Sequence, residues 1–158
     1  MRKKDEYTFD FLELGEEHSE RELERALIAR IEIFLRTMGG MFAFMGSQYR
    51  LDIGEDEYFT DLLFYHRRLK ALVAVELKIP KFMPEFAGKM QSYLTALDRQ
   101  VRQEDENPSI GIILSKETNR TVVEYVLPDA RPIGGTTYAI TPTLPKALKG
   151  QLPSPQET

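Results

Sequence analysis

Apolar residues recur along this chain with two different spacings, which predict helices in some segments and strands in others. Over residues 23–38 every third or fourth position is apolar, so we expect a helix that begins near Ser19 and ends at Gly39. The same spacing predicts a second helix over residues 85–102, and a shorter third helix is expected over residues 118–126.

The segments between these helices are apolar without helical spacing, as the strands of a buried sheet are. Gly46 marks an expected bulge in the first strand, and residues 66–70 form the polar turn between the second and the third. The fourth strand follows a helix, which indicates a parallel crossover. We therefore expect an α/β fold with a mixed sheet flanked by helices, in the order α-β-β-β-α-β-α-β. The expected strands are residues 41–53, 59–65, 72–79, 109–114 and 138–140.

The folded domain is expected to occupy residues 19–141, a length that can bury a substantial core. Residues 1–18 are polar and acidic, which is typical of a leader or linker. Residues 142–158 carry four prolines and predict a short turn followed by a loose tail.

Three charged side chains fall on one face of the hairpin that the polar turn closes. Opposed residues of paired strands share a face, and faces alternate along each strand. A two-residue turn places Asp61 opposite Ala74, and a four-residue turn places it opposite Glu76. In both registers Asp61, Glu76 and Lys78 lie on one face, at the end away from the turn, while the other face is wholly apolar.

The composition narrows the chemistry that this cluster can support. The 158 residues include no cysteine and only two histidines, which excludes thiolate metal sites and leaves Ser-His-Asp catalysis poorly supported. Neither a P-loop nor a Gly-x-Gly-x-x-Gly turn is present. Carboxylates remain as ligands, and their oxygens favour Mg²⁺ or Mn²⁺. With no bilayer-spanning run and no signal peptide in view, we expect a cytoplasmic protein without a membrane partner.

The net charge of −4 is unevenly distributed. Residues 5–24 hold nine acids and one base, whereas the rest of the chain holds 20 bases and 16 acids. The body of the protein is therefore mildly basic, which permits a nucleic-acid partner without demanding one.

Hydrolysis of a phosphodiester is one reaction that these residues can support. Asp61 and Glu76 would hold a divalent cation, with the backbone carbonyl of Leu77 as a further oxygen ligand. Lys78 would orient or help to deprotonate the attacking water and offset the charge of the phosphate. The alternative is an ordinary ion pair at solvated strand ends, because Glu-x-Lys alone is a common sequence.

The same residues carry a resemblance to a known group of enzymes. Asp61 on one strand and Glu76-Leu77-Lys78 on the next, followed by a helix, resemble the core of the PD-(D/E)XK nucleases. Within that superfamily the chain is similar to the YhcG-type bacterial nucleases over nearly its whole length. The matching stretches are residues 7–12, 42–49, 61–66, 75–78, 86–90, 107–114, 120–125 and 132–134.

The resemblance implies a restriction-endonuclease-like fold with an αβββαβ core, and a Mg²⁺-dependent endonuclease domain that acts on DNA. Carried over by position, Asp61 and Glu76 match the metal ligands, and Lys78 matches the catalytic lysine. The chain departs from the family pattern in two ways. The helical N-terminal domain that usually precedes this one is not in the sequence, so we expect an excised or naturally short C-terminal domain, and Ser47 stands where a basic residue is expected.

Four further residues are weaker candidates. Related nucleases often place a glutamine near the metal on the helix after the lysine, which makes Gln91 a catalytic candidate. Gln48, Lys81 and Lys89 flank the expected site and are candidates for contacts with substrate phosphates. The plain alternative for Gln91 is a solvent-exposed helix residue, and for Gln48 it is a polar residue at a strand edge.

Two alternatives to a DNA endonuclease stay open. A non-catalytic module that binds nucleic acid or a protein partner can keep the same fold, and a nuclease of this type can act on RNA or on branched DNA. For protein partners, a second copy of the chain and the missing N-terminal helical domain are the two candidates.

Overall fold

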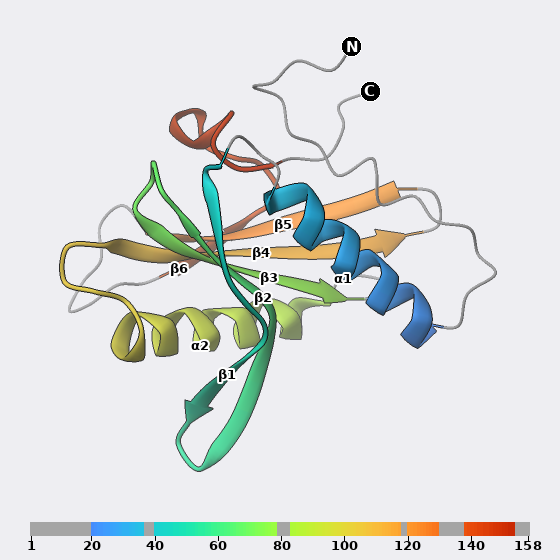
Figure 1. Ribbon diagram of the computed structural model, residues 1–158, viewed down its shortest axis with the longest axis horizontal. Coiled ribbons are helices and arrows are strands. Elements are labelled where there is room, and N and C mark those ends of the chain that lie inside the picture. The colour runs from blue at the N-terminus through green and yellow to red at the C-terminus, as the bar shows by residue number, and fades with distance from the viewer. Residues whose placement is uncertain (1–19, 37–39, 79–82, 118–119, 130–137, 154–158) are drawn as a thin grey trace.

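The computed structural model describes residues 20–36, 40–78, 83–117, 120–129 and 138–153, which form one sheet with a helix on each face (Figure 1). The strands follow one another across the sheet in chain order. Neighbouring strands are antiparallel except β3 and β4, which are parallel. The elements are α1 (Glu20–Arg36), β1 (Phe42–Ile53), β2 (Asp56–His66), β3 (Ala71–Lys78), α2 (Pro84–Gln100), β4 (Asn107–Glu117), β5 (Arg120–Pro128), β6 (Tyr138–Thr141) and the 3₁₀ turn η2 (Lys146–Leu148).

The two helices cover opposite faces because the central strands are apolar on both sides. α1 buries Ile31 and Leu35 against one side, here called the α1 face. α2 buries Met90 and Leu94 against the other, the α2 face. The chain passes from β3 through α2 to β4, and this crossover explains the parallel pair. The α1 face carries Leu62, Phe64, Val73, Val75 and Leu77, and the α2 face carries Leu63, Leu72, Ala74 and Ile113.

Most expected elements are confirmed, and so is the α/β fold with a mixed sheet. The first helix begins at Glu20, and the register of β1 shifts between Phe44 and Gly46, where a bulge was expected. β6 forms the expected edge strand. Of the helices in the described ranges, none is long and apolar enough to cross a membrane.

Residues 120–128 form strand β5, so the expectation of a helix over residues 118–126 is wrong. Val123 and Tyr125 are buried on the α1 face and Val126 on the α2 face, which is the alternation of a strand. A short apolar run does not separate the two structures by itself, and pairing with β4 and β6 settles the matter. The observed order is therefore α-β-β-β-α-β-β-β.

Residues 144–153 pack against the sheet, which corrects the expectation of a loose tail. Leu144 and Leu152 are buried in the core on the α1 face. The Tyr125 hydroxyl donates a hydrogen bond of 2.6 Å to the carbonyl of Pro153. Residues 1–18 and 154–158 lie outside the described part of the chain.

His66, at the end of β2, is buried beneath this C-terminal segment. Its Nδ1 accepts a hydrogen bond of 3.0 Å from the backbone N–H of Leu69. Nε2 therefore carries the ring proton and donates it to the carbonyl of Gln151 at 2.8 Å. The imidazole thus joins the hairpin turn to the C-terminal segment.

A polar contact fastens α2 to β4 and β6. Asp98 Oδ1 accepts hydrogen bonds from the backbone N–H and the hydroxyl of Ser109, at 3.0 and 2.8 Å. The hydroxyl of Tyr138 donates to the other oxygen of Asp98. These bonds set the position of α2 along the sheet and hence the position of its N-terminal half relative to β3.

Candidate active site

The candidate site lies where β2 and β3 stop pairing. Residues 67–70 form a four-residue turn, and the paired register ends at Leu62 opposite Val75. The register that places Asp61 opposite Glu76 is therefore confirmed. Beyond this point β2 remains paired with β1 only, and the β1–β2 hairpin extends past the rest of the sheet (Figure 1).

The carboxylate of Asp61 fills the place where the ladder between β2 and β3 would continue. Its Oδ2 accepts a hydrogen bond of 2.9 Å from the backbone N–H of Leu77. Its Oδ1 accepts one of 3.1 Å from Nε2 of Gln48 on β1. The backbone N–H of Asp61 in turn points to Oε1 of Glu76 at 3.4 Å. Asp61 is thus held from both neighbouring strands.

Glu76 lies opposite, and its side chain is 5% exposed. Burial raises the pKa of Glu76 well above its usual value, and the charge of Asp61 raises it further. The ammonium of Lys78 acts in the opposite direction but does not cancel these effects. Two acids in this position gain from a positive charge between them, which a cation can supply.

Lys78 reaches the same face from the end of β3. Its Nζ lies 4.0 Å from Oε2 of Glu76 and 5.3 Å from the centre of the Phe86 ring. The side chain is 30% exposed, so its ammonium lies between the buried carboxylate and solvent. The aromatic ring adds a cation–π contact at the start of α2.

Leu77 turns its backbone toward the site and its side chain toward the α1 face. The N–H and C=O of one residue point to the same side of a strand. Because the N–H of Leu77 reaches Asp61 on β2, its carbonyl faces the same gap. The expected role of that carbonyl as an oxygen ligand is compatible with this geometry.

Tyr93 is a neighbour of the site that the apolar pattern concealed, because it falls within the buried stripe of α2. Its ring lies 5.9 Å from that of Tyr58 on β2. Burial, and then the charges of Glu76 and Asp61, raise the pKa of Tyr93 to about 12. The phenol therefore stays neutral at physiological pH. In the sequence, Tyr93 is only one position of a buried helical stripe. The pattern therefore does not reveal that its hydroxyl lies near two acids.

The weaker candidates are distributed around this centre. Gln48 is brought onto Asp61, and exposed Lys89 lies one helical turn before Tyr93, on the same side of α2. The structure does not bring Gln91 to the carboxylates, because its amide donates to the carbonyl of Tyr138 at 3.1 Å. Lys81 lies outside the described residues.

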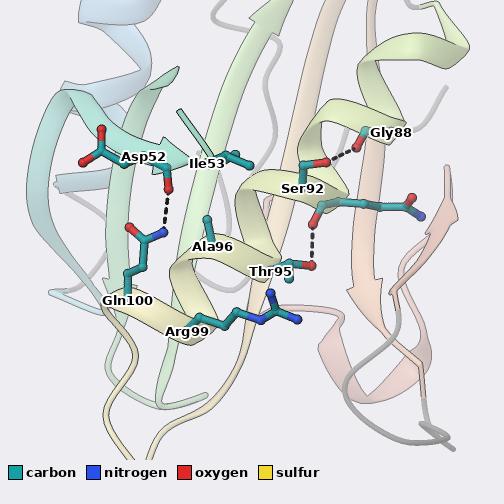
Figure 2. A pocket seen from close by; sticks show the side chains of 10 residues that line it. Asp52, Ile53, Gly88, Ser92, Thr95, Ala96, Arg99 and Gln100 are labelled. Carbon is teal, nitrogen blue, oxygen red and sulfur yellow. Dashed lines mark hydrogen bonds between the residues drawn. The ribbon is translucent and has the colours of Figure 1, made fainter. Parts of the chain in front are cut away.

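A groove of about 360 Å³ runs over the outer side of α2, beside the tip of the β1–β2 hairpin (Figure 2). Gln91 lines it, together with Gly88 and Ala96, whereas Asp61, Glu76 and Lys78 do not. Three of the polar side chains that line it donate hydrogen bonds to backbone carbonyls, as Figure 2 shows. The hydroxyls of Ser92 and Thr95 donate to the carbonyls of Gly88 and Gln91, and the amide of Gln100 donates to the carbonyl of Asp52. The groove is therefore separate from the candidate site.

The donor set at the site is small. Among the residues that the structure describes, no group of three or more His, Cys, Asp or Glu side chains converges. Two carboxylates and the Leu77 carbonyl are all oxygen donors, which suit Mg²⁺ or Mn²⁺, and the remaining positions around such an ion would fall to water and substrate. The residues present therefore fit one hard divalent cation.

Comparisons with known proteins agree with the resemblance seen in the sequence. The family model described as the YhcG PDDEXK nuclease domain matches residues 2–153. A relative from Escherichia coli strain K12, named "Putative nuclease YhcG", is 41% identical over 124 residues. The aligned region is 78% of this chain and 33% of that relative, so the chain spans about a third of the relative's length. No solved structure gave a significant match.

Proposed function

This chain belongs to the family of YhcG PDDEXK nuclease domains, and from that premise we propose that it is a Mg²⁺-dependent endonuclease domain that hydrolyses DNA. One observation carries the proposal. The carboxylates of Asp61 and Glu76 meet where β2 and β3 separate, with the ammonium of Lys78 beside them. We place the activity in the cytoplasm, because a chain without cysteine suits a reducing compartment.

Asp61 and Glu76 are the side chains that would hold the metal ion, with the Leu77 carbonyl as a third donor. When bound, Mg²⁺ supplies positive charge that polarises the phosphate and lowers the pKa of a water molecule. Asp61 is already oriented by its two hydrogen bonds, so its carboxylate needs little rearrangement. Glu76 gains most from the ion, because burial makes its own negative charge unfavourable.

Lys78 acts on the substrate side of the carboxylates. Its ammonium is partly exposed and lies within 4.0 Å of Glu76, so it can reach a phosphate oxygen or a water molecule at the site. There it would orient the attacking water and stabilise the charge that develops on the phosphate. We propose that Lys89, which is exposed on the same side of α2 as Tyr93, contacts the DNA backbone, and we propose the same role for Lys81.

Cleavage of plasmid DNA by the purified chain tests this function. Supercoiled plasmid should be nicked or linearised with Mg²⁺ or Mn²⁺, and EDTA should stop the reaction. Lys78→Ala should lower the cleavage rate by about 10²- to 10⁴-fold, the usual contribution of a positioned acid–base group, while Mn²⁺ binding persists. Lys146→Ala is the matched control, because Lys146 is exposed in η2, beside Leu144 and Leu148 on the α1 side.

Two outcomes would contradict the proposal. Equal cleavage by wild type and Lys78→Ala would trace the activity to a contaminant. DNA binding without cleavage in either metal would favour a non-catalytic binding module with this fold.

A further inference from the structure

Gln48 has a backbone conformation that strands rarely contain. It lies within β1 with φ at +48°, in the left-handed region, two residues after the register shift at Gly46. This region costs a residue with a side chain roughly 1–2 kcal/mol. Such a conformation persists only where the surrounding structure imposes it, and it is frequent at functional sites.

The conformation coincides with a contact to the candidate metal ligand. Nε2 of Gln48 donates to Oδ1 of Asp61 at 3.1 Å, while the backbone N–H of Leu77 donates to Oδ2 at 2.9 Å. A carboxylate only accepts hydrogen bonds, so the amide must present its nitrogen. Each oxygen of Asp61 therefore has one donor, and the two donors come from the strands on either side of β2.

Two donors on opposite oxygens fix a carboxylate more firmly than one. The terminal torsion of aspartate is broad, so a single hydrogen bond at Oδ2 leaves the group free to rock about its own axis. The amide of Gln48 removes that freedom. Partners that orient a metal-binding carboxylate commonly contribute 10- to 100-fold to metal affinity or activity.

We propose that Gln48 is a positioning residue for Asp61, and that its left-handed backbone is retained because it delivers the side-chain amide to the Asp61 carboxylate. The inference rests on the proposed function, since it assigns Asp61 to the metal. It also replaces the direct phosphate contact that the sequence suggested for Gln48. In the new role Gln48 acts through Asp61 and does not touch the reacting atoms.

Backbone strain and side-chain function can be separated at this position. Gln48→Gly removes the amide but relieves the left-handed backbone, because glycine adopts positive φ readily. Gln48→Met removes the amide and keeps a side chain of similar length, so the strain remains. Ser47→Ala is the matched control, because Ser47 is the preceding residue of β1 and is also exposed.

The measurements are Mn²⁺ affinity by calorimetry, melting temperature in EDTA, and the kcat and KM of plasmid cleavage. We expect Gln48→Gly and Gln48→Met both to weaken Mn²⁺ binding by about 10- to 100-fold and to lower kcat, with KM for DNA within about twofold of wild type. Gln48→Gly should melt at or above the wild-type temperature, and Gln48→Met below it. Ser47→Ala should match wild type in every measurement.

The outcomes separate this inference from the function on which it rests. If wild type binds Mn²⁺ and cleaves DNA, but Gln48→Gly keeps its Mn²⁺ affinity and kcat, the positioning role is overturned and the nuclease proposal stands. A rise in the KM for DNA in the Gln48 variants, with unchanged Mn²⁺ affinity, would support a direct contact between Gln48 and a substrate phosphate. That result would also overturn the positioning role. If wild type neither binds Mn²⁺ nor cleaves DNA, both proposals fail.

Discussion

At the scale of single residues, the site combines groups that are costly for the fold with groups that hold them in place. Glu76 is almost completely buried beside a second acid, and the ammonium of Lys78 offsets its charge only in part. Asp61 is oriented by Gln48, whose own backbone is strained. Unfavourable charge and strained backbone at one point are typical of functional sites, because a structure selected for stability alone would remove them.

The buried carboxylate of Glu76 destabilises the folded protein when it is charged, so a neutral substitute should give a more stable but inactive variant. Below a pH of about 4.5 the glutamate is protonated in both states, whereas above it the unfolded chain releases a proton that the folded protein retains. The stability of the metal-free protein therefore falls as pH rises from about 4.5 to the raised pKa of Glu76. Glu76→Gln, which is always neutral, should increase the free energy of unfolding at pH 8 by about 1 kcal/mol and abolish Mn²⁺ binding.

Urea unfolding in EDTA at pH 5 and pH 8 measures this effect. Glu55→Gln is the control, because Glu55 is exposed in the β1–β2 turn, and it should change neither stability nor metal binding. A Glu76→Gln variant less stable than wild type at pH 8 would show that the carboxylate is stabilised by its surroundings.

At the scale of elements, the site depends on where α2 rests upon the sheet. Asp98 bonds the C-terminal half of the helix to Ser109 on β4, and the absence of a side chain at Gly111 lets Met90 approach that strand. These contacts position the N-terminal half of α2, where Phe86 lies against Lys78. The helix therefore contributes an aromatic ring beside Lys78 at the candidate site.

A pair of glycine substitutions tests this packing. A Cβ at Gly111 would lie 2.6 Å from Cγ of Met90, so Gly111→Ala must displace the Met90 side chain or the helix that carries it and should lower the free energy of unfolding by about 1–3 kcal/mol. At Gly88, in α2 itself, a Cβ meets nothing within 4 Å. Gly88→Ala should therefore stabilise the protein by up to about 1 kcal/mol through helix propensity. Chemical denaturation compares the two, and equal effects would contradict the close packing of α2 on β4.

At the scale of the whole molecule, the C-terminal segment closes the α1 face far along the chain from the residues that it covers. The Tyr125 hydroxyl is hydrogen-bonded to the carbonyl of Pro153, and the His66 ring is hydrogen-bonded to the carbonyl of Gln151. Burial lowers the pKa of His66, and the charge of Arg68 lowers it further, while the hydrogen bond to Gln151 acts in the opposite direction. The neutral imidazole is thus the form that keeps the segment closed.

The lowered pKa of His66 makes the stability of the molecule depend on pH. Above the ordinary histidine pKa of 6.5 the ring is neutral in both the folded and the unfolded protein, so its full contribution to the free energy of unfolding is present. As pH falls below 6.5 the unfolded chain takes up a proton first, and stability decreases toward the lowered pKa of the folded state. Denaturation at pH 7.5 and 5.5 should show a smaller loss for His66→Phe than for wild type. An equal loss in both proteins would exclude His66 as the source.

The sequence alone was enough to determine the local frame of the site. Strand alternation placed Asp61, Glu76 and Lys78 on one face under either even-length turn, because side-chain direction repeats every two residues whatever the partner strand. The apolar spacing likewise identified α1, α2 and the strands β1 to β4. These features depend on near neighbours in the chain, and local pattern records them faithfully.

Only the tertiary structure decided the features that depend on distant partners. Residues 120–128 form β5 because β4 and β6 pair with them. Residues 144–153 pack against the sheet because Leu144 and Leu152 are buried in the apolar core on the α1 face. Gln48 reached Asp61 through a left-handed backbone, while Gln91 turned to the carbonyl of Tyr138. Burial and hydrogen bonding to residues far along the chain decide each of these outcomes, and at Gln48 they do so against the local preference of the backbone.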